Sequence, residues 1–277
     1  MVRNRVLVLL ALPAVVFLLV FFVLPLSVLV VEAGADGGSA FGRLWADPVF
    51  WKGLQGSLVL GTAAPLFSTA VGYAVALFLA RCSERRRTAL LFAISLPLTF
   101  SGLIVAYGFI LVFGRAGFVT LLLAEVGLDP AVVGGLIYSP VGLGFAYSYY
   151  LIPRVVMVVL PVVLNFDHAQ IDAACSLGAS NPRAHLDVLL PQIYPSLLTA
   201  FCLTSAVAIG AYGTALALVG TQVNILPLVL YSKISETGTD FPAAAAISVV
   251  LMGLCCLVVA VSEGMGGRRK VAARARG

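Results

Sequence analysis

Six long stretches without a single Asp, Glu, Lys or Arg constrain this chain of 277 residues more than any other feature. A helix needs about 20 apolar residues to cross roughly 30 Å of hydrocarbon, and each stretch is long enough to supply them. Backbone N–H and C=O groups cannot stay unpaired in lipid, so these stretches must cross as helices. The uncharged stretches are Val6–Val31, Gly53–Ala80, Thr88–Gly114, Pro130–Pro153, Val188–Ser232 and Phe241–Ser262.

The sequence therefore predicts an all-α integral membrane protein with six transmembrane helices in one domain, residues 1–277. Only 10% of the residues are charged, against about 25% in soluble domains, which excludes an ordinary soluble protein. The first stretch is too long for the core of a cleaved signal peptide, so we expect a retained helix. The predicted spans cover about residues 6–31, 53–80, 88–114, 135–160, 192–220 and 241–262.

The distribution of basic residues predicts that both termini face the cytoplasm, because cytoplasmic loops carry an excess of Lys and Arg. With six spans, 12 of the 17 basic residues fall on the side that holds the termini. The net charge of +5 then reflects membrane topology, and the basic tail is expected to meet anionic lipid rather than nucleic acid. The basic residues on this side are Arg3, Arg5, Arg81, Arg85, Arg86, Arg87, Arg183, Arg268, Arg269, Lys270, Arg274 and Arg276.

The predicted cytoplasmic loop between spans four and five, residues 164–191, has an internal order of its own. Asp167 is a candidate N-cap, and Gln170 three residues later completes a capping-box pattern. A short helix would end at Gly178, which suits a C-terminal cap. Asn181, followed by a proline, reads as a second N-cap. The loop is therefore predicted to form helix, tight turn and helix.

Small residues form one face of the first predicted helix in this loop. Ala174 and Gly178 make a small-xxx-small pair, and Ala173 beside them also has almost no side chain. Such a face allows another backbone to approach closely. A ridge of this kind in water is interpreted as a docking surface for another protein. The alternative is a compact loop whose alanines simply favour helix, and the residues alone leave both interpretations open.

The spacing of Asp172-Ala173-Ala174, Gly178 and Leu190-Pro191 resembles the EAA loop of permease subunits from type I binding-protein-dependent ABC importers. The family's pattern is Glu-Ala-Ala, then Gly, then Leu-Pro. The opening of the second span, "QGSLVLGTAAPLFSTAVGYAVALFLAR", is also similar to this family, so the likeness covers most of the chain. Asp172 departs from the family's Glu: it keeps the charge but shortens the side chain by one methylene.

The resemblance implies the type I importer permease fold in a bacterial inner membrane, with this loop coupled to a separate pair of ATP-binding subunits. It also implies a second permease subunit, in a heterodimer or a homodimer, and an extracytoplasmic solute-binding protein. Of the residues in the loop, Ala173, Ala174 and Gly178 are implied to fit a groove of the ATPase, and Leu190-Pro191 to end the loop. The residues implied to couple to the ATPase are Asp172, Ala173, Ala174, Gly178, Leu190 and Pro191.

The chain itself is expected to be non-catalytic and to bind neither a cofactor nor a metal ion. None of its three lysines lies in a G-x-x-x-x-G-K-[ST] sequence, which in ATPases cradles the phosphates of ATP. ATP and Mg²⁺ are therefore expected in the partner subunits.

Two other functions compete with that of a permease subunit. An intramembrane serine protease could use Ser180, but the two histidines, His168 and His185, lie in the cytoplasmic loop, and no span contains a base for a nucleophile. An ion-coupled secondary carrier would commonly place ionisable residues inside the bilayer. Here only Arg154 comes close, near the end of the fourth span, and it is interpreted as reaching the interface or pairing with a loop carboxylate.

The translocation path is predicted to run between spans three, four and five. Tyrosines there could stack on an organic cation, although an anion path would not exclude them. The stretches "GAYGTALALVGTQVNILPLVLYSKI" and "FGRAGFV" resemble polyamine and aminophosphonate permeases most, with iron(III), thiamine and sulfate permeases next. The candidate path residues are Ser101, Tyr107, Tyr147, Tyr150, Gly210, Tyr212, Gly213 and Thr214.

Overall fold

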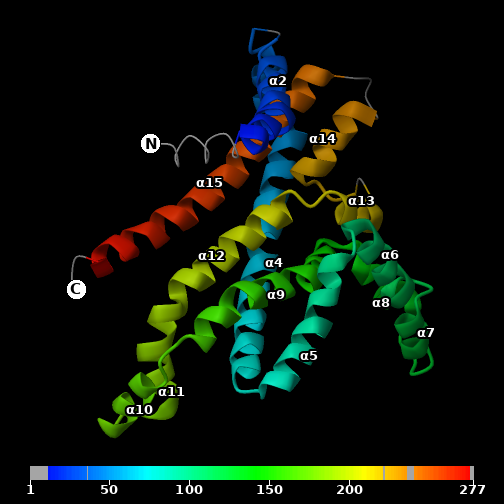
Figure 1. Ribbon diagram of the computed structural model, residues 1–277. Coiled ribbons are helices and arrows are strands. Elements are labelled where there is room, and N and C mark those ends of the chain that lie inside the picture. Colours follow the sequence, from blue (N-terminus) through cyan, green and yellow to red (C-terminus); the bar gives the residue numbers. More distant parts are fainter. Residues whose placement is uncertain (1–11, 36, 221, 236–239, 275–277) are drawn as a thin grey trace, which may run out of the picture.

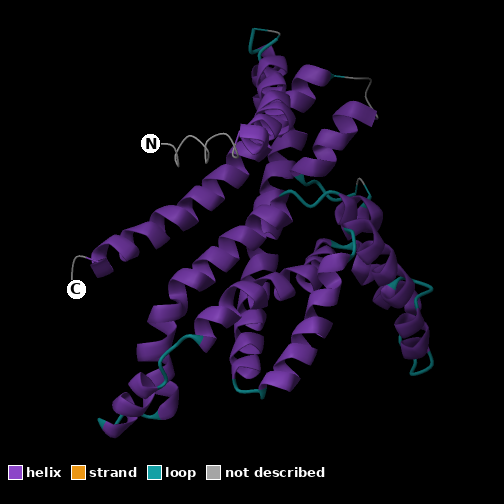
Figure 2. Ribbon diagram, in the orientation of Figure 1, coloured by secondary structure: helices purple, strands orange, loops and turns teal. Residues whose placement is uncertain are grey.

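The computed structural model describes residues 12–35, 37–220, 222–235 and 240–274, and the regular elements in these ranges are all helical (Figures 1 and 2). Arg3, Arg5 and Arg276, which support the predicted orientation, lie outside the described residues. The elements are η1 (Leu19–Val23), α2 (Leu24–Ala33), α3 (Ser39–Ala46), α4 (Pro48–Ala80), α5 (Glu84–Ser95), η2 (Leu96–Thr99), α6 (Gly102–Phe113), α7 (Phe118–Ala124), α8 (Pro130–Gly135), η3 (Leu136–Tyr138), α9 (Pro140–Leu164), α10 (Ala169–Ser176), α11 (Asn181–Ala184), η4 (His185–Leu189), α12 (Leu190–Ile209), α13 (Gly213–Val219), α14 (Leu226–Ser235) and α15 (Phe241–Arg274).

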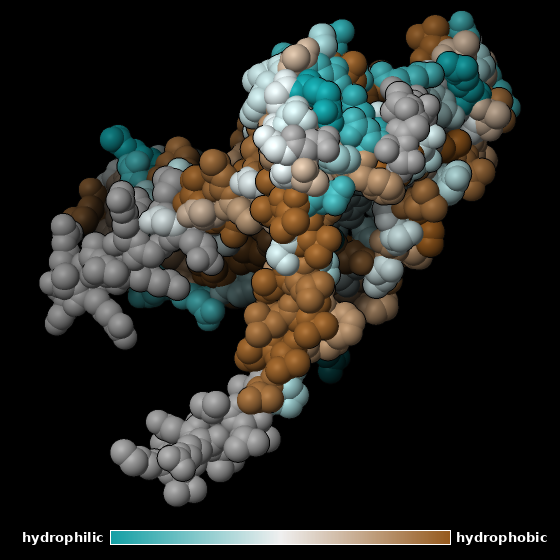
Figure 3. All heavy atoms as spheres, turned by 90° about the horizontal axis from the view of Figure 1, so that it is seen from above, coloured by the Kyte–Doolittle hydropathy of each residue, from teal (hydrophilic) through white to brown (hydrophobic). Residues whose placement is uncertain are grey.

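The part of the chain that the structure describes contains six helices long and apolar enough to cross a membrane, which confirms the predicted fold class. The most apolar part of the first is not buried at all within this chain, and Figure 3 shows hydrophobic side chains covering a helical arm that projects from the body. Residues 6–11 of the predicted first span lie outside the described residues. The six candidate spans are Leu12–Ala33, Pro48–Ala80, Gly102–Ala124, Pro140–Leu164, Asn181–Ile209 and Phe241–Ser262.

The third predicted span, residues 88–114, is not one continuous helix in the structure. It comprises α5 and α6, joined by the 3₁₀ turn η2 and by an extended backbone at Phe100 and Ser101. Pro97 lies in this turn, where its missing N–H group removes a helix hydrogen bond. The Ser101 hydroxyl then accepts from the N–H of Ile104 at 3.4 Å and caps α6.

The fifth predicted span, residues 192–220, is also interrupted. α12 ends at Ile209, and α13 begins only at Gly213. The glycines at 210 and 213 favour such a break, because glycine is a poor helix former and exposes its backbone. Backbone outside a helix is tolerated at membrane depth only where it lies within protein or lines a cavity, so the surroundings of these two breaks bear on the predicted path.

The centre of the bundle is the packing of α4 against α9 and α12 (Figure 1). Gly72 permits the close approach of α4 to α9, since a Cβ at this position would lie 2.7 Å from side-chain carbons of Val155. A buried cluster that includes Leu79, Val159 and Ile193 joins these three helices toward the end where α10 and α11 lie. The bundle therefore links the loop between α9 and α12 to the membrane core.

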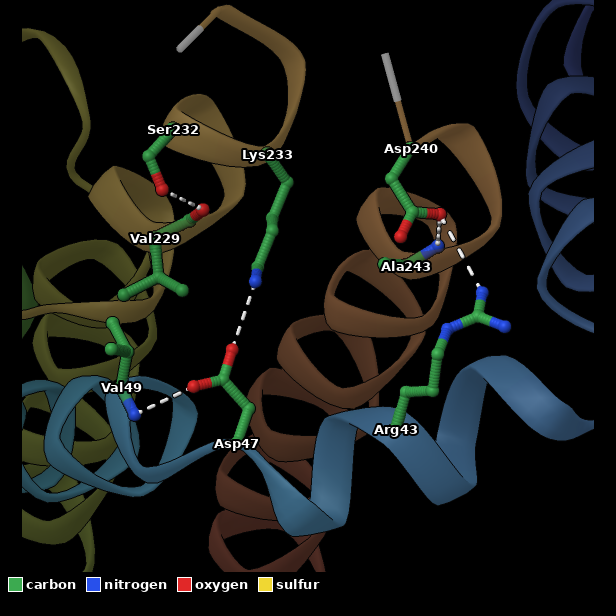
Figure 4. A network of polar contacts seen from close by, with 8 residues as sticks. All are labelled: Arg43, Asp47, Val49, Val229, Ser232, Lys233, Asp240 and Ala243. Carbon is green, nitrogen blue, oxygen red and sulfur yellow. Dashed lines mark hydrogen bonds and ion pairs between the residues drawn. The ribbon is translucent and has the colours of Figure 1, made fainter. Parts of the chain in front are cut away.

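Two ion pairs join helices at the opposite end of the molecule (Figure 4). Lys233 of α14 donates from Nζ to Oδ2 of Asp47 at 2.8 Å, and Arg43 of α3 lies 3.7 Å from Asp240, next to the start of α15. Asp47 also caps α4 by accepting from the N–H of Val49 at 2.9 Å. Partial burial would raise the pKa of Asp47, but the hydrogen bonds from Lys233 and Val49 and the charge of Lys233 together hold its pKa below the ordinary value.

Candidate functional site

The loop between α9 and α12 forms a compact helical tip at one end of the molecule (Figure 1). Its first helix, α10, begins after Asp167, whose Oδ1 accepts from the N–H of Ala169 at 3.1 Å. The Gln170 side chain does not complete a capping box. Instead its Oε1 accepts from Nε2 of Gln192 at 2.6 Å, which ties α10 to the start of α12.

Gly178 ends α10 in the way that the sequence predicts. Its φ of +94° lies in the left-handed region, which glycine adopts without steric cost. The N–H of Gly178 donates to Cys175 at 3.0 Å, and the N–H of Ala179 donates to Ala174 at 3.1 Å. These two hydrogen bonds form a Schellman motif and satisfy carbonyls at the end of the helix. A Cβ at Gly178 would meet nothing within 4 Å, so backbone conformation rather than space requires the glycine.

The faces of α10 differ from the predicted ridge. Ile171 is buried in the cluster between α4, α9 and α12, and Ala174 packs against that cluster, so Ala174 faces the permease rather than the outside. Ala173 and Gly178 are exposed, as is Asp172. The most prominent outward side chain is Leu177, which is 91% exposed. Sequence reasoning missed Leu177, because a lone leucine beside a glycine gives no signal of its exposure.

The second half of the loop begins one residue earlier than predicted. Ser180 is the N-cap of α11, and Asn181 is the first helical residue. A turn of π-helix, η4, leads into α12, where Leu190 and Pro191 are the first two residues. Leu190 is half-buried and Pro191 is exposed. All six predicted coupling residues thus lie within one continuous helix–turn–helix segment.

A cavity of about 280 Å³ lies where the two broken spans meet. Of the predicted path residues, Tyr150, Gly210, Gly213 and Thr214 line it, together with Gly102 at the start of α6. The Thr214 hydroxyl donates to the carbonyl of Gly102 at 3.0 Å, a hydrogen bond that joins the two helix breaks. The cavity therefore combines exposed backbone from two interrupted helices with a few polar side chains.

The remaining predicted path residues do not line this cavity. Tyr147 is fully buried, and its hydroxyl donates to the carbonyl of Ala211 at 2.9 Å, so it supports the break after α12. Tyr212 packs on Tyr231, with ring centroids 5.5 Å apart. Tyr107 is 55% exposed on α6. Ser101 caps α6 beside the cavity.

Arg154 lines the same cavity, which the sequence did not predict. Its Nε is buried without a hydrogen-bond partner, and no ion pair joins it to a carboxylate in the described part of the chain. The structure thus differs from the interpretation of Arg154 as a side chain that reaches the interface or pairs with a loop carboxylate. The buried hydroxyl of Tyr150 lies nearby.

Comparisons with known proteins agree with this arrangement. Residues 72–269 match the model of the family described as binding-protein-dependent transport system inner membrane component. Sulfate permease 2, chloroplastic, of Chlamydomonas reinhardtii is 28% identical over 84% of this chain, which spans 63% of that relative's length. The spermidine/putrescine transport system permease protein PotB of Salmonella typhimurium (strain SL1344) is 26% identical over 76% of this chain and 74% of its own.

The fold is also that of a solved transporter. A chain in the crystal structure of a bacterial alginate ABC transporter, in complex with an alginate pentasaccharide-bound periplasmic protein, has a TM-score of 0.79 at 19% identity. The likeness covers 96% of this chain and 95% of that one. Because the family model matches most of the sequence and the described residues carry six candidate spans, this chain belongs to the binding-protein-dependent transport system inner membrane components, as a non-catalytic permease subunit of an ABC importer.

Proposed function

We propose that the loop of residues 164–191 is the element through which a separate ATPase drives this permease. The observation that carries the proposal is the exposure of Leu177 at the tip of the loop. Binding of a partner that removes such an exposed apolar side chain from water is favourable, because the burial lowers the free energy. Gly178 holds the turn that presents it, and Asp172 and Ala173 form the exposed surface beside it.

The loop is connected to the membrane cavity by rigid structure. Ile171 inserts α10 into the cluster shared by α4, α9 and α12, and the hydrogen bond between Gln170 and Gln192 fixes α10 to the start of α12. α12 then continues to Ile209, immediately before the cavity-lining Gly210. When the ATP-binding subunits close, a docked loop would move α9 and α12 together and change the access to the cavity.

ATP and Mg²⁺ would bind to the partner subunits, and this chain would contribute no cofactor site. A second permease subunit would complete the path, as a companion chain of related sequence or as a second copy. An extracytoplasmic solute-binding protein would deliver the solute; the solved alginate transporter was crystallised with a protein of that kind.

The solute remains a choice among the classes that the sequence suggests: a polyamine or an aminophosphonate first, then iron(III), thiamine or sulfate. The two curated relatives support different members of this set, since one is a sulfate permease and the other a spermidine/putrescine permease. Relatives at this level of identity do not choose between a cationic and an anionic solute.

The test of docking is the variant Leu177→Glu in the full importer, purified from cells that co-express the neighbouring genes. A charge at the tip should prevent its burial, so we expect at least a tenfold loss of the co-purified ATPase and of ATP-dependent uptake. Val126→Glu is the matched control, because Val126 is 79% exposed in the loop between α7 and α8. Normal ATPase association of Leu177→Glu, or uptake driven by an ion gradient without any ATPase, would overturn the proposal.

A further inference from the structure

We propose that the cavity between α6, α9 and α13 receives an anion, and that Arg154 is the residue that selects it. This inference rests on the proposed function, because it names the class of solute that the permease would pass. The class is that of small oxyanions, such as sulfate, phosphate or a phosphonate, which present several acceptor oxygens to arginine.

The first reason is the depth of Arg154 in the membrane. Ten residues separate it from Leu164, the last residue of α9, which places it about 15 Å from that end of the helix, at 1.5 Å per residue. Arg154 therefore lies well inside the candidate span Pro140–Leu164. Charged residues within a membrane span are costly, and they usually face a bundle interior or a water-filled cavity.

The second reason is that the charge of Arg154 has no counter-ion within the described residues. Its Nε is buried without a hydrogen-bond partner, and no Asp or Glu lines the cavity. The buried hydroxyl of Tyr150 lies near both Arg154 and Thr214. A half-buried cation without a counter-ion and a hydroxyl donor on the same cavity wall are complementary to an anion with several acceptor oxygens.

The third reason is a second positive cavity at the other end of α13. This cavity, of about 460 Å³, is lined by Arg115, Gln222 and Gly220 among others, and no Asp or Glu contributes to it. The Arg115 guanidinium lies 5.7 Å from the centre of the Tyr138 ring. α13 therefore has an arginine-lined cavity at each end, and a solute that moves along it would meet positive charge twice.

The same arrangement argues against a polyamine. A cation in the first cavity would be repelled by Arg154, and like-charge repulsion of this kind is a common device for rejecting a wrong ligand. Recognition of an organic cation by aromatic faces would require several rings around one space. Of the four predicted path tyrosines, only Tyr150 lines the cavity, because Tyr147 is fully buried and Tyr107 and Tyr212 lie elsewhere.

The experiment measures thermal unfolding of the full chain in lipid nanodiscs, with whatever subunits co-purify, at constant ionic strength. The probes are sodium sulfate, sodium phosphate, 2-aminoethylphosphonate and spermidine. A ligand that binds the folded state raises the unfolding temperature. We expect at least one anion to raise the unfolding temperature of the wild type by more than that of Arg154→Gln. Arg154→Lys should retain part of this rise. Spermidine should raise the unfolding temperature of neither the wild type nor Arg154→Gln. Lys52→Gln, which removes an exposed lysine from the start of α4, should behave like the wild type.

The unfolding temperature without a probe is the second measurement. Removing an unpaired, half-buried charge should leave this temperature unchanged or higher, whereas a lower value for Arg154→Gln would show that a partner subunit pairs with Arg154 and would overturn the proposal. Equal anion shifts in the wild type and Arg154→Gln, or a shift with spermidine alone, would also overturn it. Comparing sulfate, phosphate and 2-aminoethylphosphonate distinguishes which oxyanion binds. The assay requires no ATPase, so its result is independent of the docking test.

Discussion

Leu177 and Arg154 violate the ordinary rules of burial in opposite directions. Leu177 exposes a leucine side chain to water at the tip of the loop, with 91% of its surface accessible. Arg154 places a guanidinium at the middle of a membrane helix, with its Nε buried and unpaired. Leu177 is an apolar side chain in water, and Arg154 is a charged side chain within a membrane helix. Burial against the proposed ATPase would stabilise the first, and the proposed anion would stabilise the second.

The difference between the two regions lies in how they are held. The loop is fastened to the bundle by buried side chains that include Ile171, Ala184 and Leu189, by the hydrogen bond between Gln170 and Gln192, and by the turn at Gly178. The cavity is held by packed helices and by hydrogen bonds across two helix breaks, of which Thr214 to Gly102 and Tyr147 to Ala211 are the clearest. The loop is therefore suited to docking of the ATPase, and the cavity to selection of the solute.

The largest effect that separates the regions is expected for Ile171→Ala. Truncating this buried anchor should cost about 2–4 kcal/mol, from lost burial and the void it leaves. Helix α10 should lose its anchor, since Ile171 is its buried residue, so we expect loss of ATPase co-purification, while the effect of anions on thermal unfolding persists. Ile171→Val should cost only about 0.5–1.5 kcal/mol and serve as the control. A loss of the anion effect in Ile171→Ala would show that the regions are not separable.

A somewhat smaller effect is expected for Gly178→Val. The left-handed conformation costs about 1–2 kcal/mol for an L-residue, and a β-branched side chain tolerates it worst. Transport should fall on the order of tenfold, since 1.4 kcal/mol corresponds to that factor. Gly178→Asn should retain most activity, because Asn visits this conformation routinely and the space around the position is open. Equal activity of the two variants would contradict a role for the turn conformation.

Tyr147→Phe should change solute transport through the cavity without changing the docking of the ATPase. The substitution leaves the Ala211 carbonyl without the hydroxyl that donates to it at 2.9 Å, at a cost of about 1–2 kcal/mol. We expect altered solute transport with normal ATPase co-purification, measured on the same preparation. A loss of ATPase binding would show that the break after α12 controls the loop.

The smallest effect concerns the ion pairs at the far end. The pKa of Asp47 is lowered from 3.8, so its stabilisation is complete above that value and is lost as the pH falls through its lower folded-state value. The pair is partly exposed, with side-chain exposures of 27% and 21%, and is worth about 1 kcal/mol or less. Unfolding measured from pH 6 to about pH 3 should show a slightly smaller loss of stability in Asp47→Asn than in the wild type. Identical stability profiles of the two proteins would show that the pair of Asp47 and Lys233 does not contribute to the pH dependence.

Much of the fold could be predicted from the sequence because lipid leaves few choices. Uncharged stretches identify the spans, and Gly178 identifies the turn, since few residues other than glycine adopt its backbone conformation. The interruptions at Phe100–Ser101 and at Gly210–Tyr212 were not predicted. Hydropathy does not register a helix break, because the broken segments remain equally apolar.

The candidate site was predictable only in part. The small residues of the loop and the polar residues near the fifth span were found, but Ala174 faces the core and Leu177 faces outward. A shift of one position around a helix turns a side chain by about 100°, so the direction of a short helix depends on how it is anchored. The buried Ile171 fixes that direction here.

The sequence by itself determined that this chain crosses a membrane as helices and that a glycine-ended helical loop follows the fourth span. Both follow from local chemistry, namely the cost of charges and unpaired backbone groups in lipid and the conformational freedom of glycine. Only the tertiary structure decided that Arg154, Tyr150 and Thr214 share a cavity and that Leu177 stands at the tip. Such neighbours come from separate helices, and their meeting depends on how α4, α9 and α12 pack, which no local pattern specifies.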